Sequence, residues 1–258
     1  MRAYDRVKIA RSNDRPTASD YIKKIFTSFI ELHGDRRFRD DKAVIGGIAL
    51  LSDLPVTVIG IEKGHTAEER IEHSFGSASP EGYRKALRLM KLSEKFHRPV
   101  ITLVDTSGAY CGIGAEERGQ GEAIAENLLE MSALEVPIIS LLIGEGGSGG
   151  ALALALSDRL WMLENSIYSV ISPEGCASIL WRDAAYAADA ADALCLTAGA
   201  ALRFGIADRI ISESDIGSDG FYSRLGKELY EEIRRLSSIG NIREERYIRF
   251  RSYGEMER

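Results

Sequence analysis

A glycine-rich stretch in the middle of the chain constrains the fold more than any other feature. The stretch 144–151, GEGGSGGA, lies between an apolar run at 137–143 and an Ala/Leu run at 151–156. This order predicts a buried strand, a glycine loop and the start of a helix. Glycine lets a ligand approach the backbone closely, and the first amides of a helix have no internal partners. Such a loop presents amides to negative charge, either a bound phosphate or an oxyanion that develops during a reaction.

A second glycine-bearing loop, 105–114 (DTSGAYCGIG), follows another short apolar run at 99–104. Apolar strands that alternate with helices predict α/β layering, with the loops at one edge of a sheet. The two loops follow consecutive core strands, so we expect them to lie side by side where α/β proteins bind ligands. One glycine cluster alone is equally consistent with a tight turn. Two clusters on adjacent strands favour a ligand-binding site.

The rest of the chain continues the pattern of strand, loop and helix. The expected segments are an arm without a clear period up to residue 16, a helix at 17–34 capped by Thr17, a strand hairpin at 44–51 and 56–61, a helix from Ser79-Pro80 to about Phe96, a helix at 115–134, short strands at 160–163, 167–170 and 209–211, helices between 173 and 205, a long amphipathic helix at 221–238 and a basic helical tail from Ile242.

Composition excludes several classes of protein. With 258 residues, 45% of them hydrophobic, the chain can bury a large core. A net charge of −6 gives no general attraction to nucleic acid or anionic membrane. Three widely spaced cysteines without a C-x-x-C pair predict neither a disulfide framework nor a metal site. No apolar signal region precedes the first helix and no long apolar span is uninterrupted, so we expect a cytoplasmic protein with no membrane helix.

The two loops hold little acid–base machinery. The segment 144–149 fits G-x-G-x-x-G, but no acidic residue follows at the position that a dinucleotide site requires, and no G-K-[ST] is present. Ser148 resembles a nucleophile at a helix start, yet every histidine precedes residue 98. Asp105 is either a catalytic carboxylate or a tie for the turn that follows it. Lys63 and His65 either touch an anionic ligand or are exposed loop residues.

A site rich in amides and poor in acid–base groups suits a reaction whose reactants bring their own base. Five segments then show a resemblance to a known family. They are 80–88 (PEGYRKALR), 105–110 (DTSGAY), 114–120 (GAEERGQ), 144–151 (GEGGSGGA) and 169–181 (SVISPEGCASILW). Together they resemble the carboxyltransferase α subunit of bacterial acetyl-CoA carboxylase. The resemblance runs from about residue 15 to 213 and, more loosely, to 253.

The resemblance implies a ClpP/crotonase-like α/β fold of repeated ββα units with flanking N- and C-terminal helices. The expected divisions are an N-terminal arm and helix at 1–40, a carboxyltransferase domain at 41–215 and a C-terminal helical segment at 216–258. It also implies transfer of a carboxyl group from carboxybiotin to acetyl-CoA, which gives malonyl-CoA for fatty-acid synthesis. Biotin would be attached to a biotin carboxyl carrier protein and not to this chain. The other implied partners are biotin carboxylase and a β subunit with a zinc ribbon, in an α2β2 heterotetramer.

In such a reaction the amides would stabilise negative charge on the ureido oxygen of biotin, and the biotin nitrogen would take the methyl proton of acetyl-CoA. The predicted oxyanion donors are the backbone amides of Gly146, Gly147, Gly108 and Ala109. The predicted substrate-binding residues are Gly144, Ser148, Gly149, Tyr110 and Gly112.

The loop at 105–114 departs from the family pattern at two positions. Ser107 and Cys111 stand where the family often has proline, which predicts a less rigid loop. Three alternatives stay open beside the main interpretation. The chain could serve a carboxyltransferase for another acyl-CoA, a Clp-like hydrolase that uses Ser148, or a non-catalytic paralogue.

Overall fold

The computed structural model describes residues 1–254. Its strands are β1 (Thr27–Glu31), β2 (Val44–Leu51), β3 (Leu54–Ile61), β4 (Val100–Thr106), β5 (Ile138–Gly147), β6 (Arg159–Leu163), β7 (Ile167–Ser169) and β8 (Arg209–Ile211). Its α-helices are α1 (Ala3–Ala10), α2 (Ala18–Ile25), α3 (Ala67–Glu72), α4 (Pro80–Lys95), α5 (Ile113–Glu117), α6 (Gln120–Ala133), α7 (Ser148–Ala155), α8 (Pro173–Leu180), α9 (Ala187–Ala193), α10 (Ala198–Arg203), α11 (Asp219–Leu236) and α12 (Ile242–Arg251).

One mixed sheet carries the fold, with strand order β1-β2-β3-β4-β5-β6-β8 and with β7 paired to the end of β5. The strands from β1 to β3 are antiparallel, and every pairing from β3 to β8 is parallel. The predicted hairpin is confirmed, with Val44 opposite Ile61 and a tight turn at Ser52 and Asp53. The parallel strands therefore direct their carboxyl ends to one edge of the sheet.

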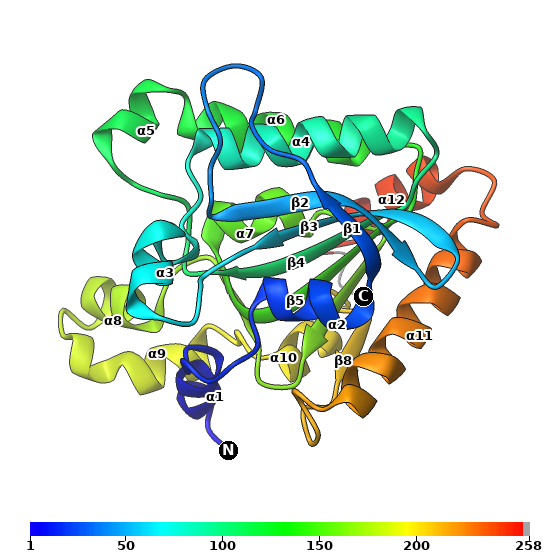
Figure 1. The fold of residues 1–258 in the computed structure, drawn as a ribbon. Coiled ribbons are helices and arrows are strands. Elements are labelled where there is room, and N and C mark those ends of the chain that lie inside the picture. The colour runs from blue at the N-terminus through cyan, green and yellow to red at the C-terminus, as the bar shows by residue number, and fades with distance from the viewer. Residues whose placement is uncertain (255–258) are drawn as a thin grey trace.

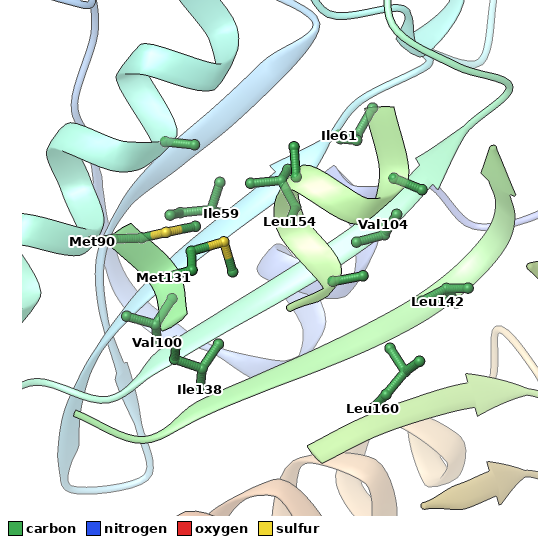
Figure 2. Close-up of a cluster of buried hydrophobic side chains, with 14 of the residues drawn as sticks. Ile59, Ile61, Met90, Val100, Val104, Met131, Ile138, Leu142, Leu154 and Leu160 are labelled. Atoms are coloured by element: carbon green, nitrogen blue, oxygen red, sulfur yellow. The ribbon is translucent and has the colours of Figure 1, made fainter. Parts of the chain in front are cut away.

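Helices cover both faces of the sheet (Figure 1). On one face α4, α6 and α7 pack against β3, β4 and β5, and on the other face α2 and α11 pack on the same strands. Figure 2 shows the first of these cores, where methionines from α4 and α6 and a leucine from α7 meet the sheet. The labelled members are Ile59, Ile61, Met90, Val100, Val104, Met131, Ile138, Leu142, Leu154 and Leu160. Because β4 and β5 are buried on both faces, they read as continuous apolar runs.

The predicted helix at 17–34 is correct only in its first half. It ends at Ile25, and β1 follows, paired antiparallel to β2. The apolar residues after Ile25 keep a helical spacing, but their segment pairs with β2 instead. Strand formation depends on tertiary context and here overrides the local pattern. Gly47 permits the pairing, since a Cβ at this position would lie 2.0 Å from the carbonyl oxygen of Ile30.

Three further expectations need correction. The N-terminal arm contains a helix, α1, which buries Val7 and Ala10 against α9. The helix expected at 115–134 is broken at Gly119, whose φ of +81° separates α5 from α6. The strand β5 extends to Gly147, so the first half of the glycine stretch is strand and only Ser148 begins the helix. Within the described residues, the structure holds no helix with the length and hydrophobicity of a membrane span.

A buried lysine makes the stability of the fold sensitive to acid. Lys85 of α4 donates to Asp40 Oδ1 at 2.6 Å. Partial burial opposes ionisation of Asp40, but the hydrogen bonds from Lys85 and from the Gly34 amide outweigh it and lower the pKa of Asp40 to about 2. A carboxyl group whose folded pKa lies below its unfolded pKa stabilises the fold above the unfolded value and loses that stabilisation as the pH falls through the folded value.

We therefore expect Asp40→Asn to remove part of the acid sensitivity of the fold. Because the Asp40 side chain is 32% exposed, its contribution is about 1 kcal/mol. Urea unfolding at pH 4.5 and 2.5 measures it: the original chain should lose about this much more stability between the two values than the Asp40→Asn variant. Equal losses in both proteins would contradict the prediction.

Candidate functional site

The carboxyl ends of β3, β4 and β5 meet at one edge of the sheet. They carry Lys63, the loop at 105–114 and the glycine stretch, and α3, α5 and α8 lie around them on the left of Figure 1. The prediction that the two glycine-bearing segments lie side by side is confirmed by their contacts. A Cβ on Gly147 would lie 2.2 Å from the Ser107 carbonyl oxygen, and a Cβ on Gly150 would lie 2.5 Å from the Ala109 nitrogen. These positions accept only glycine at this separation of the two backbones.

The strand β5 passes into α7 through a strained residue. Ser148 is exposed and has a φ of +55°, and Gly147 before it provides no side chain to cap α7. The first-turn amides of α7 thus have no partner within the helix. A small cavity of about 50 Å³ opens at this point, and its lining includes Gly146, Gly147 and Ser107. Backbone amides at a helix start favour negative charge here.

The two amides predicted as donors in the loop after β4 differ in whether they are already engaged. The Gly108 amide donates to Thr106 Oγ1 at 3.0 Å, and the Thr106 hydroxyl donates to the Gly108 carbonyl oxygen at 2.9 Å, so this amide is already engaged. The Ala109 amide donates to no acceptor within residues 1–254. Of the two donors predicted in this loop, Ala109 is the one that remains free for a ligand.

The other predicted binding residues lie at different depths of the site. Gly144 is buried, and the Asp105 carboxylate fills the space where its side chain would start, with Oδ1 at 2.4 Å. Tyr110 is exposed, and its ring covers Gly112, the residue before α5. Gly149 is half-buried on α7 against α6. The surface of the site is therefore formed by 147–149 and 109–112, with Gly144 beneath it.

An ionic cluster lies under these loops. Asp105 Oδ1 accepts a hydrogen bond from the Glu145 amide at 2.8 Å and lies 2.6 Å from Lys63 Nζ. Glu145 Oε1 accepts from Arg11 Nε at 2.7 Å. Of the two roles left open for Asp105, the tie to the following turn is made instead by Thr106, while Asp105 itself ties β4 to β5. Lys63 is largely buried and is not an exposed loop residue.

The N-terminal segment forms one wall of the site, which sequence reasoning missed. Arg11 and Arg15 line a cavity of about 190 Å³ together with Lys63, Asp105 and Glu145. Arg15 donates to the Ile143 carbonyl oxygen at 2.8 Å and pairs with a glutamate beyond β8. The only signal in the sequence was a pair of arginines four residues apart in a polar arm. Within residues 1–254, no group of three His, Cys, Asp or Glu side chains is arranged to hold a metal ion.

Ser148 has no base beside it. In residues 1–254, His33 and His65 contact Asp40 and Asp20 respectively, His73 contacts the Lys42 carbonyl oxygen, and none contacts Ser148. A serine hydrolase needs such a base to activate its nucleophile. The structure thus gives no support to the hydrolase alternative.

We expect Ser148→Ala to change the activity of this site by no more than about tenfold, whereas loss of a triad serine costs about a millionfold. Ser148 should also stay unlabelled by a fluorophosphonate probe, as read by mass spectrometry. Stoichiometric labelling of Ser148 would contradict the prediction.

Comparison with known proteins shows which family this chain belongs to. The family model described as "Acetyl co-enzyme A carboxylase carboxyltransferase-like" matches residues 1–254. The acetyl-coenzyme A carboxylase carboxyl transferase subunit alpha of Ruminiclostridium cellulolyticum is 62% identical over 235 residues, 91% of this chain and 90% of that protein. The subunit alpha of Streptococcus pneumoniae is 56% identical over 249 residues, 96% and 98% of the two chains. This chain belongs to the family of acetyl-CoA carboxylase carboxyltransferase alpha subunits.

Solved structures extend this family resemblance to the fold. Transcarboxylase 12S superimposes with a TM-score of 0.73 at 17% identity, over 90% of this chain and 44% of the other. A chain of the Pseudomonas malonate decarboxylase hetero-tetramer superimposes with a TM-score of 0.71 at 17% identity, over 92% and 96% of the two chains. The α/β crotonase-type fold expected from the sequence of this carboxyltransferase family member is therefore confirmed.

Proposed function

We propose that this chain is the alpha subunit of an acetyl-CoA carboxylase carboxyltransferase, which moves a carboxyl group from carboxybiotin to acetyl-CoA and gives malonyl-CoA for fatty-acid synthesis. The observation that carries the proposal is the 62% identity with a subunit of this name over nine-tenths of both chains. The site supports it chemically, because it presents backbone amides and places no general base beside them. The reaction needs stabilisation of a developing oxyanion more than proton transfer by a side chain.

Carboxybiotin supplies the carboxyl group: its C–N bond breaks, a C–C bond forms to the acetyl methyl carbon, and the methyl proton passes to the biotin nitrogen. The amides of Gly146, Gly147 and Ala109 stabilise the negative charge that develops on the ureido oxygen. Gly108 stabilises the turn through its hydrogen bonds with Thr106 and so positions the amide of the next residue, Ala109. One such donor contributes about 10²–10³ in rate.

The residues around these amides bind the substrates. Ser148 and Gly149 on one side and Tyr110 and Gly112 on the other form the rim through which biotin on its carrier protein enters. Gly144 contributes by admitting the Asp105 carboxylate, which supports the floor of the site.

The β subunit covers the edge of the sheet that holds the site. Exposed apolar side chains lie on and around α5 and α8. These two helices lie beside the loops (Figure 1). The exposed side chains are Ile113, Val170, Ile179 and Leu180. Contiguous exposed apolar patches mark surfaces that a partner covers, and we assign these four side chains to such a surface. The β subunit, with its zinc ribbon, supplies the acetyl-CoA side of the site in an α2β2 assembly, which works with biotin carboxylase and the biotin carboxyl carrier protein. Three unpaired cysteines fit the reducing cytoplasm.

The test is malonyl-CoA formation from acetyl-CoA and carboxybiotin with this chain alone, with a β subunit alone and with both. Activity only in the mixture is the expected result. Full activity without the β subunit would contradict the split site. Inactivity of a complex shown to form by gel filtration would contradict the acetyl-CoA carboxyltransferase assignment, and propionyl-CoA in the same assay would identify another acyl-CoA substrate.

A further inference from the structure

We propose that Lys63, acting through Asp105, is a positioning residue that aims the Gly146 and Gly147 amides at the reacting oxygen. The inference rests on the proposed function, since it assigns those amides to the oxyanion. It adds a residue that follows a third strand, β3, to the two loops that carry the predicted donors.

The first observation is an irregularity in the sheet just before the site. Along the β4–β5 pair, Val104 lies opposite Leu142, but Thr106 lies opposite Gly146. One residue of β4, Asp105, therefore faces the three residues 143–145 of β5. An insertion of this kind bends a strand and re-aims the residues after it. Here the residues that follow are Gly146 and Gly147.

On the side of β4 a side chain holds this bulge, while on its other side β7 pairs with residues 145–147. The Asp105 carboxylate accepts the Glu145 amide at 2.8 Å. It also occupies the space beside Gly144, where its two oxygens and its carboxyl carbon lie within 2.7 Å of a Cβ position. On the side of β4, the backbone of residues 144–145 therefore packs directly around the Asp105 carboxylate, so its position there depends on where that carboxylate lies.

Lys63 sets the place of the carboxylate. Its Nζ lies 2.6 Å from Asp105 Oδ1 and 3.5 Å from Glu145 Oε2. The side chains of Lys63, Asp105 and Glu145 are 19%, 9% and 10% exposed, and a buried carboxylate needs a paired cation. Arg11 pairs with Glu145 Oε1 at 2.7 Å, and Lys63 pairs with Asp105. Lys63 comes two residues after β3, so the charges link three adjacent strand ends.

Loss of the cation should leave the fold in place and the amides misaligned. A displacement of about 1 Å at a positioned group costs about 10²-fold in rate. The expected effect therefore falls on kcat, whereas acetyl-CoA binding, placed on the β side of the site, should change little.

The experiment compares Lys63→Met and Lys63→Arg in the complete enzyme with the β subunit and carboxybiotin. Lys63→Met should lower kcat by about 10- to 100-fold, with the KM for acetyl-CoA within about twofold of the original. Lys63→Arg keeps the charge and should recover most of the loss. In the Lys63→Met background, Asp105→Asn should add little further loss, because the two residues act as a unit.

Asp158→Asn is the matched control. Asp158 is a carboxylate with 3% exposure, paired with Arg246 at the opposite edge of the sheet. This variant should lower Tm and leave kcat unchanged. An unchanged kcat in Lys63→Met, or a loss that Lys63→Arg does not recover, would overturn the proposal.

A readout independent of turnover separates the inference from the proposed function. In Lys63→Met the amide ¹H–¹⁵N shifts of Gly146 and Gly147 should move, and in Asp158→Asn they should not. If the original complex is inactive but these shifts move, the proposed function fails and the positioning role stands. If they do not move, the positioning role is wrong.

Discussion

Gly147→Ala is expected to lower malonyl-CoA formation by the assembled enzyme by at least about 100-fold. The new methyl group would lie 2.2 Å from the carbonyl oxygen of Ser107, 2.4 Å from its carbonyl carbon and 2.9 Å from the Thr106 oxygen. All three are backbone atoms, so no side-chain rotation relieves the contact and the two loops must separate. Separation moves the Gly147 and Ala109 amides apart, and they can no longer approach one oxygen together.

Gly121→Ala is the control for this variant. Gly121 lies in the first turn of α6, and no heavy atom lies within 4 Å of its Cβ position. Alanine should leave activity unchanged there and raise stability slightly, by about 0.5–1 kcal/mol. Gel filtration with the β subunit checks that both variants assemble. A Gly147→Ala enzyme with more than half of the original kcat would contradict the predicted oxyanion role.

Arg246→Met should lower the free energy of unfolding by about 3–5 kcal/mol, the cost of leaving one member of a buried ion pair alone. Arg246 on α12 is 1% exposed. Its guanidinium donates to both oxygens of Asp158 at 2.9 Å and to the carbonyl oxygens of Met131, Leu134 and Val136. It thus caps the C-terminal end of α6 and attaches α12 to Asp158, the residue before β6. Methionine keeps the length of the side chain and removes every one of these bonds.

The pH dependence of the loss follows from Asp158. Burial raises the pKa of Asp158 and Arg246 opposes the rise, so without Arg246 this pKa should rise further. A carboxyl group with a folded pKa above its unfolded value destabilises the fold increasingly as the pH rises through the folded value. Urea unfolding should therefore show a larger deficit for Arg246→Met at pH 8 than at pH 5.

Two controls separate this ion pair from a general effect on α12. Arg243→Met changes an exposed arginine of the same helix and should cost less than about 0.5 kcal/mol. Adding Asp158→Asn to Arg246→Met removes the unpaired charge and should recover part of the loss. A cost below about 1 kcal/mol for Arg246→Met would contradict the predicted role.

Several features of the protein could be read from the sequence because their causes are local. The Ser79-Pro80 start of α4, the hairpin of β2 and β3 and the apolar runs of β4 and β5 depend on residues within one element. Glycines at 147 and 150 indicate that another backbone segment comes close, although the sequence does not say which segment it is. Local motifs also carried the family resemblance, which the comparisons bear out.

Other features required the tertiary structure because their partners are distant in the chain. Ile30 is in a strand because β2 offers an edge and Gly47 leaves room for it. The glycine stretch looked like a loop, but β4 and β7 recruit its first half into the sheet.

The charged residues show most clearly what could not be predicted from the sequence. Lys63, Asp105 and Arg246 look like ordinary polar positions in the sequence. Their roles come from burial beside an opposite charge 42 residues away for Lys63 and 88 residues away for Arg246. The sequence alone determined that two glycine loops meet at one edge of an α/β sheet, since strand order and glycine spacing are enough for that. Only the folded chain decided that the Gly108 amide is engaged while the Ala109 amide is not, and which ion pairs lie beneath the loops, because hydrogen bonds and ion pairs form between atoms that folding brings together.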